Sequence, residues 1–156
     1  MAMSSAKARI VYPLEKWVIN PLVMIAWRVG IPPPGDALLE TIGRHSGLPR
    51  HTPVCDGLDG KNFWLVAQRG PRAGWVKNIG ANPRVRVKVR TASGVRWRNG
   101  TARIVPRDDP RARRRRIGQR NLSRRLCVSA SAAMATDPLT VYVKLDGQRG
   151  WRRRQR

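Results

Sequence analysis

Apolar positions follow two different periods along this chain. Over residues 10–29 they recur at helical spacing, and Asn20 and Pro21 interrupt the pattern because proline lacks the N–H that a helix interior requires. From Ala37 onward apolar and polar positions alternate with a period of two, which is typical of strands with one buried face. Between these regions, the Pro-rich segment 31–35 cannot be helical. The sequence therefore predicts a helical lead, a stiff linker and a β-rich body.

The β-rich body is expected to contain about six strands, at residues 37–42, 50–58, 62–68, 84–90, 95–104 and 140–145. In the fourth of these, Val85, Val87 and Val89 alternate with arginine and lysine, so one face belongs to the core and the other is cationic. Asp59 and Gly60 predict a hairpin that joins the second strand to the third. This pattern favours a mainly β (α+β) fold, built as a small closed or split β-barrel.

Helices are expected at few places in the body. Residues 74–82 are too polar for a strand and end at Asn82-Pro83, which predicts a short helix. Asp108, Asp109 and Pro110 are typical of a helix start, and an arginine-rich run follows them before the last strand. We therefore divide the chain into a helical lead with its linker (1–35), a barrel domain (36–147) and a disordered basic tail (148–156).

Positive charge dominates the composition. The chain of 156 residues has 32 Lys+Arg against 9 Asp+Glu, a net charge of +23. This length suits one domain that can bury a core without a disulfide or a structural metal. The charge admits three anionic partners, namely nucleic acid, an acidic membrane surface or a polyanionic small molecule.

The cysteines and histidines form no metal-binding pattern. Cys55 and Cys127 lack CxxC or Cys/His spacing, and His45 and His51 do not form an HxxxH helix pattern, so no metal site is expected. Charged residues and prolines interrupt the apolar start of the chain, which argues against a signal peptide or a spanning helix. We expect a cytoplasmic protein.

The segment 40–53 is the first candidate binding element. A turn bounded by Gly43 and Gly47 is expected to leave backbone N–H groups free for an anion, and Arg44, Arg50 and nearby hydroxyls add donors. The alternative is an ordinary glycine hairpin with solvated arginines.

The segment 66–83 is the second candidate binding element. Arg69 is placed at a strand end, just before the start of a predicted helix, and such an arrangement favours anions. Trp75 could cover an aromatic ring of a ligand, or it could be a core anchor.

Three stretches of these segments, 42–53, 67–71 and 75–83, resemble a known family in the same order and at similar distances. The family is that of the deazaflavin-dependent nitroreductases and quinone reductases, with the pattern T-G-R-K-[ST]-G-x-P-R-x-[NT]-P, a strand ending A-[AS]-[KR]-G-G, and W-[YV]-x-N-[LI]-x-A-N-P. The resemblance implies a split β-barrel related to FMN-binding proteins, and coenzyme F420 as the ligand, with FMN as the less favoured alternative.

The resemblance also implies a coenzyme site, with residues transferred position by position. The phosphate and acidic tail of F420 would bind to Arg44, His45, Ser46, Arg50, Thr52 and Pro53. Ala67, Gln68 and Arg69 would line the pyrimidine side of the deazaflavin and its phosphate, and Trp75 and Asn78 would belong to the helix that closes over it. His45 replaces the usual lysine, which removes a permanent cation. No catalytic side chain is expected, because the hydride chemistry belongs to the coenzyme.

The function we expect is an F420H2-dependent oxidoreductase that transfers a hydride to a small hydrophobic acceptor: a quinone, an enone or unsaturated lipid-like compound, or a nitro compound. The alternatives are a nucleic-acid-binding β-barrel, which the all-valine second face of residues 84–90 disfavours, and an F420- or FMN-binding protein without turnover. The assembly is expected to be a monomer or a homodimer.

The helical lead has two interpretations. It either caps one end of the barrel or rests on acidic lipid, with Trp17 and Trp27 at the interface and flanking cations toward the headgroups. The second interpretation places the protein peripherally at the inner face of the cell membrane.

Overall fold

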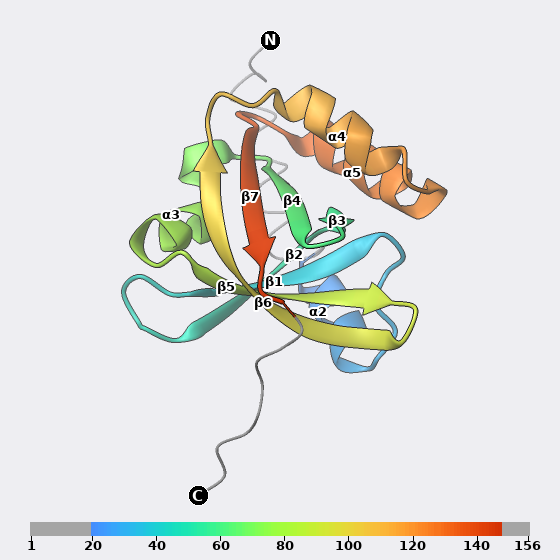
Figure 1. The fold of residues 1–156 in the computed structure, drawn as a ribbon, viewed down its shortest axis with the longest axis horizontal. Coiled ribbons are helices and arrows are strands. Elements are labelled where there is room, and N and C mark those ends of the chain that lie inside the picture. The colour runs from blue at the N-terminus through green and yellow to red at the C-terminus, as the bar shows by residue number, and fades with distance from the viewer. Residues whose placement is uncertain (1–19, 148–156) are drawn as a thin grey trace, which may run out of the picture.

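A computed structural model describes residues 20–147 of the chain. A seven-stranded antiparallel sheet with the order β2-β1-β5-β6-β7-β4-β3 curls into a split barrel (Figure 1). The strands are β1 (Asp36–Ile42), β2 (Pro49–Cys55), β3 (Leu58–Asp59), β4 (Asn62–Ala67), β5 (Arg84–Thr91), β6 (Gly94–Val105) and β7 (Leu139–Leu145). The helices are α2 (Asn20–Arg28), the 3-10 turn η2 (Gly70–Arg72), α3 (Gly74–Ala81), α4 (Pro110–Gly118) and α5 (Leu122–Met134).

The core lies inside the curled sheet. Val85, Val87 and Val89 of β5 are buried, as their alternation with cations predicts. They pack with Leu39 of β1 and Phe63 of β4, both fully buried. The period of two therefore located the core face correctly.

The long strand β6 joins the two halves of the barrel. Its first part pairs with β5 and its last part, from Gly100 onward, pairs with β7. A Cβ on Gly100 would lie 2.7 Å from Val143 Cγ1 and 2.8 Å from the Lys144 carbonyl oxygen. The missing side chain lets β7 approach closely where β6 changes partners.

The prediction that a hairpin joins the second expected strand to the third is wrong, because the turn at Asp59 and Gly60 joins a different pair of strands. The strand expected over residues 50–58 ends at Cys55, because Asp56 Oδ1 accepts the Leu58 N–H at 3.0 Å and turns the chain. Gly60, with φ 61°, instead forms the tight turn between the two-residue β3 and β4. β2 pairs with β1, and β4 pairs with β7, so these two strands lie near opposite ends of the sheet order.

The cationic face of β5 is largely paired. Arg86 donates to both oxygens of the buried Glu40 at 2.7 Å, and His51 Nε2 lies 2.8 Å from Glu40 Oε2. The hydrogen bond from Arg86 is the main cause that lowers the pKa of Glu40. Lys88 and Arg86 also lie over the ring of Trp97. Little of this face is left as a free cationic surface.

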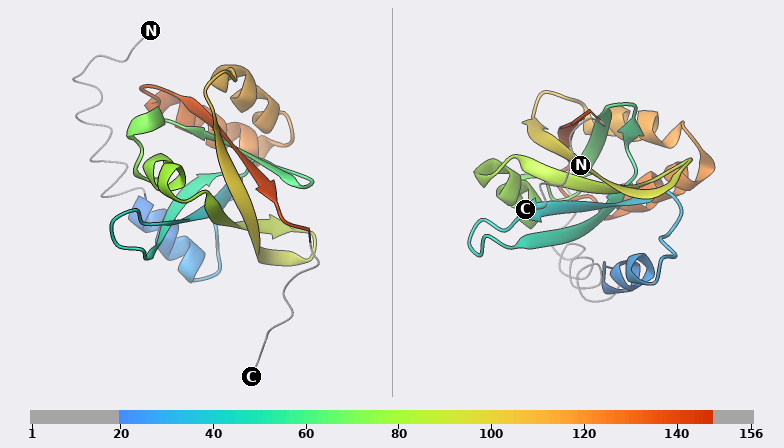
Figure 2. Two further views of the ribbon diagram at one scale, coloured as in Figure 1. Left: turned by 60° about the vertical axis from the view of Figure 1, so that its left-hand side comes forward. Right: turned by 60° about the horizontal axis from the view of Figure 1, so that its bottom comes forward.

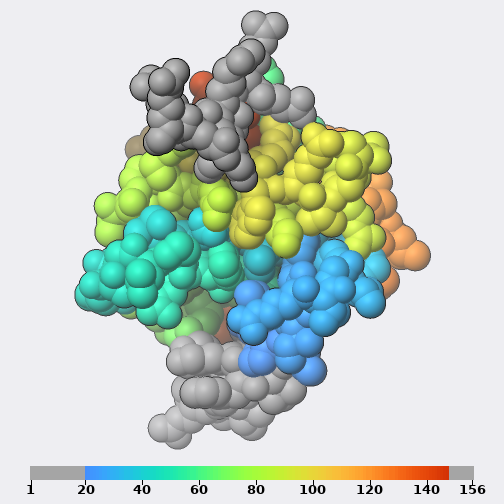
Figure 3. Space-filling view, turned by 90° about the horizontal axis from the view of Figure 1, so that it is seen from below, coloured from blue at the N-terminus to red at the C-terminus, as the bar shows by residue number. Residues whose placement is uncertain are grey.

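Helix α2 covers part of the same outer face (Figure 2). Trp27 is 4% exposed and lies beneath Lys88, whose Nζ is 5.6 Å from the ring centroid. Trp27 therefore packs on the barrel, as the capping interpretation expected, and is withdrawn from a lipid surface. Trp17 and the expected helix over residues 10–19 lie outside the described residues. In the space-filling view, α2 lies beside the β1–β2 hairpin (Figure 3).

The arginine-rich region forms two packed helices rather than one. α4 begins as predicted, with Asp109 accepting the Arg111 N–H at 2.9 Å and Pro110 in the first turn. A second start at Asn121, whose side chain accepts the Arg124 N–H at 2.9 Å, separates α5 from α4. Both helices lie on the opposite side of the barrel from α3 (Figure 1).

A disulfide between Cys55 and Cys127 ties α5 to the end of β2. The two cysteines are 72 residues apart, and no short-range spacing pattern in the sequence signals their pairing. The sequence, whose length suits a core that needs no disulfide, did not predict this bond. The bond therefore joins two segments, β2 and α5, that are distant in the sequence.

Candidate functional site

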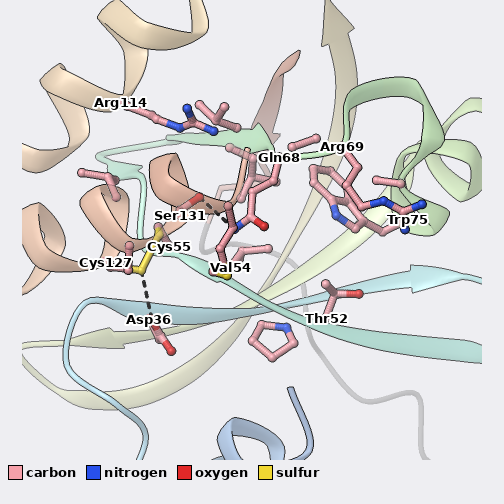
Figure 4. A pocket seen from close by; sticks show the side chains of 18 of the residues that line it. Asp36, Thr52, Val54, Cys55, Gln68, Arg69, Trp75, Arg114, Cys127 and Ser131 are labelled. Atoms are coloured by element: carbon pink, nitrogen blue, oxygen red, sulfur yellow. Dashed lines mark hydrogen bonds between the residues drawn. A yellow bond between two sulfur atoms is a disulfide. The ribbon is translucent and has the colours of Figure 1, made fainter. Parts of the chain in front are cut away.

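A pocket of about 480 Å³ lies in the split of the barrel, where the curled sheet brings β2 opposite β4 (Figure 4). Its walls come from these two strands, the start of α3, and helices α2, α4 and α5. Its polar lining residues include Asp36, Thr52, Gln68, Arg69, Arg114 and Ser131. The pocket is therefore apolar over much of its wall, with a few polar groups that can orient a ligand.

Six of the residues that the resemblance assigned to the coenzyme line this pocket: Thr52, Pro53, Ala67, Gln68, Arg69 and Trp75. They come from β2, from the end of β4 and from the start of α3. These segments are distant in sequence, and the folding of the barrel brings them around one cavity.

The other five assigned residues do not line the pocket. Arg44, His45, Ser46 and Arg50 are exposed on the β1–β2 hairpin. Asn78 is buried in α3, where its Nδ2 donates to Thr41 Oγ1 at 3.1 Å. These positions leave the hairpin residues available to a part of a ligand that extends out of the pocket.

Asn78 connects the hairpin to α3. Its Oδ1 accepts hydrogen bonds from the backbone N of Arg44 at 3.2 Å and from Arg44 Nη1 at 3.1 Å. Because Asn78 also donates to β1, one buried amide fixes the hairpin, the strand and the helix relative to each other. It can act on a ligand by holding Arg44 in place.

The glycine turn uses several of the backbone donors that the sequence led us to expect to be free. The Gly43 N–H donates to the Leu48 carbonyl and the Gly47 N–H to the Gly43 carbonyl, both at 2.8 Å. The Leu48 N–H donates to Ser46 Oγ at 3.3 Å, and the Arg44 N–H is used by Asn78. Among the described residues, the backbone N–H groups of His45 and Ser46 make no hydrogen bond, so these two donors and the exposed side chains are left for an anion.

The end of β4 is held rigidly beside the pocket. Gln68 Nε2 donates to Ser131 Oγ of α5 at 2.9 Å, while Gln68 Oε1 is buried without a partner among the described residues. Gly70, with φ 53°, lies so close to the Asp137 carbonyl that a Cβ would clash. Gln68 Oε1 is thus a fixed acceptor that a ligand N–H can satisfy.

The start of α3 supplies donors on the other side. Ala73, the residue before the helix, makes no side-chain cap, so the first N–H groups of α3 have no partner within the helix. Ala73, Gly74 and Trp75 line the pocket, and Arg69 lies just before them. A helix N-terminus beside an arginine suits an anionic group such as a phosphate.

Several pocket residues were missed by sequence reasoning. Arg114 of α4 is 8% exposed, and its Nε and Nη2 have no partner among the described residues. Burial, and then the charge of Arg111, lowers the pKa of Arg114. Its one sequence signal is helical spacing to the buried Ile117, which the surrounding arginine run obscures.

Asp36 is a second missed residue. Burial raises the pKa of its carboxyl to about 6, and Asp36 Oδ1 lies 3.1 Å from Cys127 Sγ. A disulfide sulfur carries no hydrogen, so a hydrogen bond here requires the proton to be on Asp36.

Within residues 20–147, no group of three or more His, Cys, Asp or Glu side chains could hold a metal ion. In the same part of the chain, no helix has the length and apolar character needed to cross a membrane.

Solved structures with this fold include F420 reductases and a heme storage protein. An F420-H2 dependent reductase aligns with a TM-score of 0.51 and 19% identity over 72% of this chain and 94% of its own. Another F420 reductase aligns with a TM-score of 0.50 and 21% identity over 73% of this chain and 88% of its own. HutZ, a heme storage protein from Vibrio cholerae, aligns with a TM-score of 0.50 and 13% identity over 73% of this chain and 83% of its own. At these identities the similarity establishes the split-barrel fold.

The sequence itself establishes the family. No curated protein matches the chain. The family described as F420H(2)-dependent quinone reductase, however, matches residues 25–146, which include the pocket lining from Asp36 to Met134. The chain therefore belongs to the F420H(2)-dependent quinone reductase family, and it is an oxidoreductase with F420 as its coenzyme.

Proposed function

We propose that the chain binds reduced F420 with its ring in the pocket between β2, the end of β4 and α3, and that it transfers a hydride to a quinone. The observation that supports this best is the combination of a mostly apolar pocket with a buried, unpartnered acceptor at Gln68 Oε1. An imide N–H, such as that of the deazaflavin ring, would satisfy this acceptor. The residues present therefore fit the coenzyme.

The binding roles follow from where each residue lies. Ala67, which is small, and Trp75, which is flat, border the space for the ring. Arg69 and the uncapped start of α3 suit the phosphate. The acidic tail would extend to the hairpin, where the exposed residues Arg44, His45, Ser46 and Arg50 supply donors.

The coenzyme, when bound, supplies the hydride, and the chain contributes binding and environment. The hydrogen bond to Ser131 already fixes the Gln68 side chain, so Gln68 Oε1 can orient the ring without a further loss of side-chain conformational entropy on binding. Leu65, Ile117 and Val128 border the pocket and would exclude water from the ring and the acceptor once both are bound. The protein would thereby hold ring and acceptor together in a mostly apolar pocket.

The acceptor is proposed to occupy the part of the pocket bordered by α4 and α5. Ile117, Val128 and Met134 make this part apolar, which suits a small hydrophobic molecule. Enones and nitro compounds share that property, and the family description favours the quinone among them.

Attachment to a membrane surface is a further part of the proposal. Leu22 and Ile25 of α2, and Val29 just after it, are 62%, 53% and 64% exposed, and their spacing puts them on the side away from the buried Trp27. This apolar stripe would contact the lipid that carries a hydrophobic quinone.

The proposed binding mode is tested by titrating the full chain with oxidised F420, FMN and FAD and measuring affinity by calorimetry. The double variant Arg44→Ala/Arg50→Ala should bind F420 at least about tenfold more weakly, since each charge-assisted contact contributes roughly 1.5–3 kcal/mol. Arg96→Ala/Arg107→Ala is the matched control, because it removes the same charge from two exposed positions outside the pocket. Equal F420 affinity in the two double variants would contradict the assigned tail site.

A further inference from the structure

Arg114 is a buried cation without a counterion among the described residues. Its Nε and Nη2 are inaccessible to solvent and make no hydrogen bond there. The carboxylates around α4 are already engaged: Asp108 accepts from Arg113 at 2.9 Å, Asp56 pairs with Arg124 at 3.0 Å, and Asp59 pairs with Arg120. A buried guanidinium in this state destabilises the fold by itself, and an anionic ligand would relieve the cost.

The guanidinium group is directed into the pocket. Arg114 extends from α4 toward Gln68, while Arg69 and Trp75 lie at the other end of the cavity (Figure 4). Arg114 also borders a second hollow between α4 and α5, where Arg111, Arg115 and Arg125 add positive charge. Arg114 thus lies between the part of the pocket proposed for the coenzyme ring and a strongly cationic surface. In this position its guanidinium can donate hydrogen bonds to a substrate oxygen that becomes negatively charged.

Reduction of a quinone creates such an oxygen. When the hydride forms an O–H bond at one quinone oxygen, the π electrons shift through the ring and leave a pair on the opposite oxygen, and the deazaflavin loses the two electrons that the quinone gains. The oxygen is then a phenolate until it takes a proton from solvent, while the second hydrogen of the reduced coenzyme leaves as a proton. Donors placed in advance at that oxygen stabilise the transition state.

We propose that Arg114 is a catalytic residue, whose guanidinium donates hydrogen bonds to the quinone oxygen that becomes negatively charged during hydride transfer. This assignment rests on the proposed function, because it requires the coenzyme ring to lie near Gln68. It explains why an arginine with no partner in the described part of the chain occupies a buried position in a helix that has many exposed arginines.

The proposal is tested first by kinetics of the full chain with F420H2 and a soluble quinone. Arg114→Met should lower kcat on the order of 100-fold and leave F420 affinity unchanged. Arg114→Lys keeps the charge and should recover part of the rate. Arg115→Met is the matched control on the same helix, because Arg115 is exposed and does not line the pocket, and it should behave as the unmodified chain.

A second readout does not depend on turnover. A fluorinated nitrophenol, whose ionisation is followed by fluorine NMR, imitates the phenolate oxygen. Bound to the full chain, its pKa should fall by roughly one to three units, because a guanidinium nearby favours the charged form. Arg114→Met should abolish this shift, and Arg115→Met should preserve it.

Two results would overturn the proposal. Unchanged kcat and an unchanged phenol pKa in Arg114→Met would show that Arg114 does not face the acceptor. A large loss of F420 affinity in Arg114→Met, with the phenol pKa shift retained, would assign the guanidinium to an anionic group of the coenzyme. If the full chain does not bind F420, the proposed function fails, and the phenol titration decides by itself whether Arg114 forms an oxyanion site.

Discussion

The Cys55–Cys127 disulfide is predicted to contribute a large part of the stability of this fold. It ties α5 to the end of β2, and it borders the pocket. The perturbation is the double variant Cys55→Ser/Cys127→Ser, which removes the covalent bond with little change in volume. The unfolded chain then regains the freedom of a loop that spans a sequence separation of 72 residues.

The size of the effect follows from that separation. The entropy of closing a loop of this length corresponds to about 4.4 kcal/mol near 25 °C in the chain-entropy treatment, and measured values for natural disulfides are commonly about 2–5 kcal/mol. For a domain of this size, such a loss lowers Tm by roughly 10 °C.

The assay is urea unfolding of the oxidised chain and of the double variant, followed by tryptophan fluorescence, with thiol titration to verify the redox state. Adding a reductant to the oxidised chain should reproduce the stability of the variant, and the same reductant should leave the variant unchanged. If the oxidised chain and the variant unfold at the same urea concentration, the disulfide does not stabilise the fold. Two thiols that react in the folded, unreduced chain would refute the pairing itself.

Two further predictions concern Asp36 and α2. Burial raises the pKa of Asp36 from 3.8 to about 6, so the folded state binds this proton more tightly than the unfolded state, and the stability gained in this way is lost as the pH rises through about 6. The variant Asp36→Asn should therefore stabilise the chain near pH 8 but not near about pH 4. An equal effect on Tm at both pH values would contradict this. Replacing Leu22, Ile25 and Val29 by Ser should reduce co-sedimentation with acidic vesicles at low salt while F420 affinity persists. This triple variant is preferable to a deletion of α2, because Trp27 of α2 is packed on the barrel. Failure of the unmodified chain to co-sediment would disprove the membrane proposal.

Local patterns predicted those parts of the fold that depend on local structure. The alternation of Val85, Val87 and Val89 identified both the strand and its buried face, because side chains on a strand alternate whatever its partners are. Asp109 and Pro110 marked the start of α4 for a similarly local reason.

Strand partners and strand ends depended on contacts across the chain. Asp59 and Gly60 do form a turn, but the neighbouring strand of β4 over most of its length is β7, which lies far along the sequence. The end of β2 is set by the Asp56 side chain and the close approach of Gly57 to Trp64. No periodicity in the sequence records such contacts.

The candidate site likewise contains residues that local motifs predicted and residues that only the folded chain reveals. The motif resemblance located Thr52, Gln68 and Trp75, which the structure brings to one pocket. It could not locate Arg114, because an arginine run looks uniform in sequence and only packing decides which member is buried. The disulfide was missed for the same reason, since α5 reaches β2 only in the folded chain.

The most direct test of the account is the reaction itself. Reduced F420 and a soluble quinone are mixed without oxygen, with and without the full chain, and the reappearance of oxidised F420 is followed by its absorbance; reduced FMN is treated in parallel. The account predicts that the chain accelerates oxidation of F420H2 by the quinone, saturably in both reactants, and that FMN is the poorer coenzyme. A rate equal to that of the protein-free mixture, although the chain binds F420, would contradict the claim that this pocket catalyses hydride transfer.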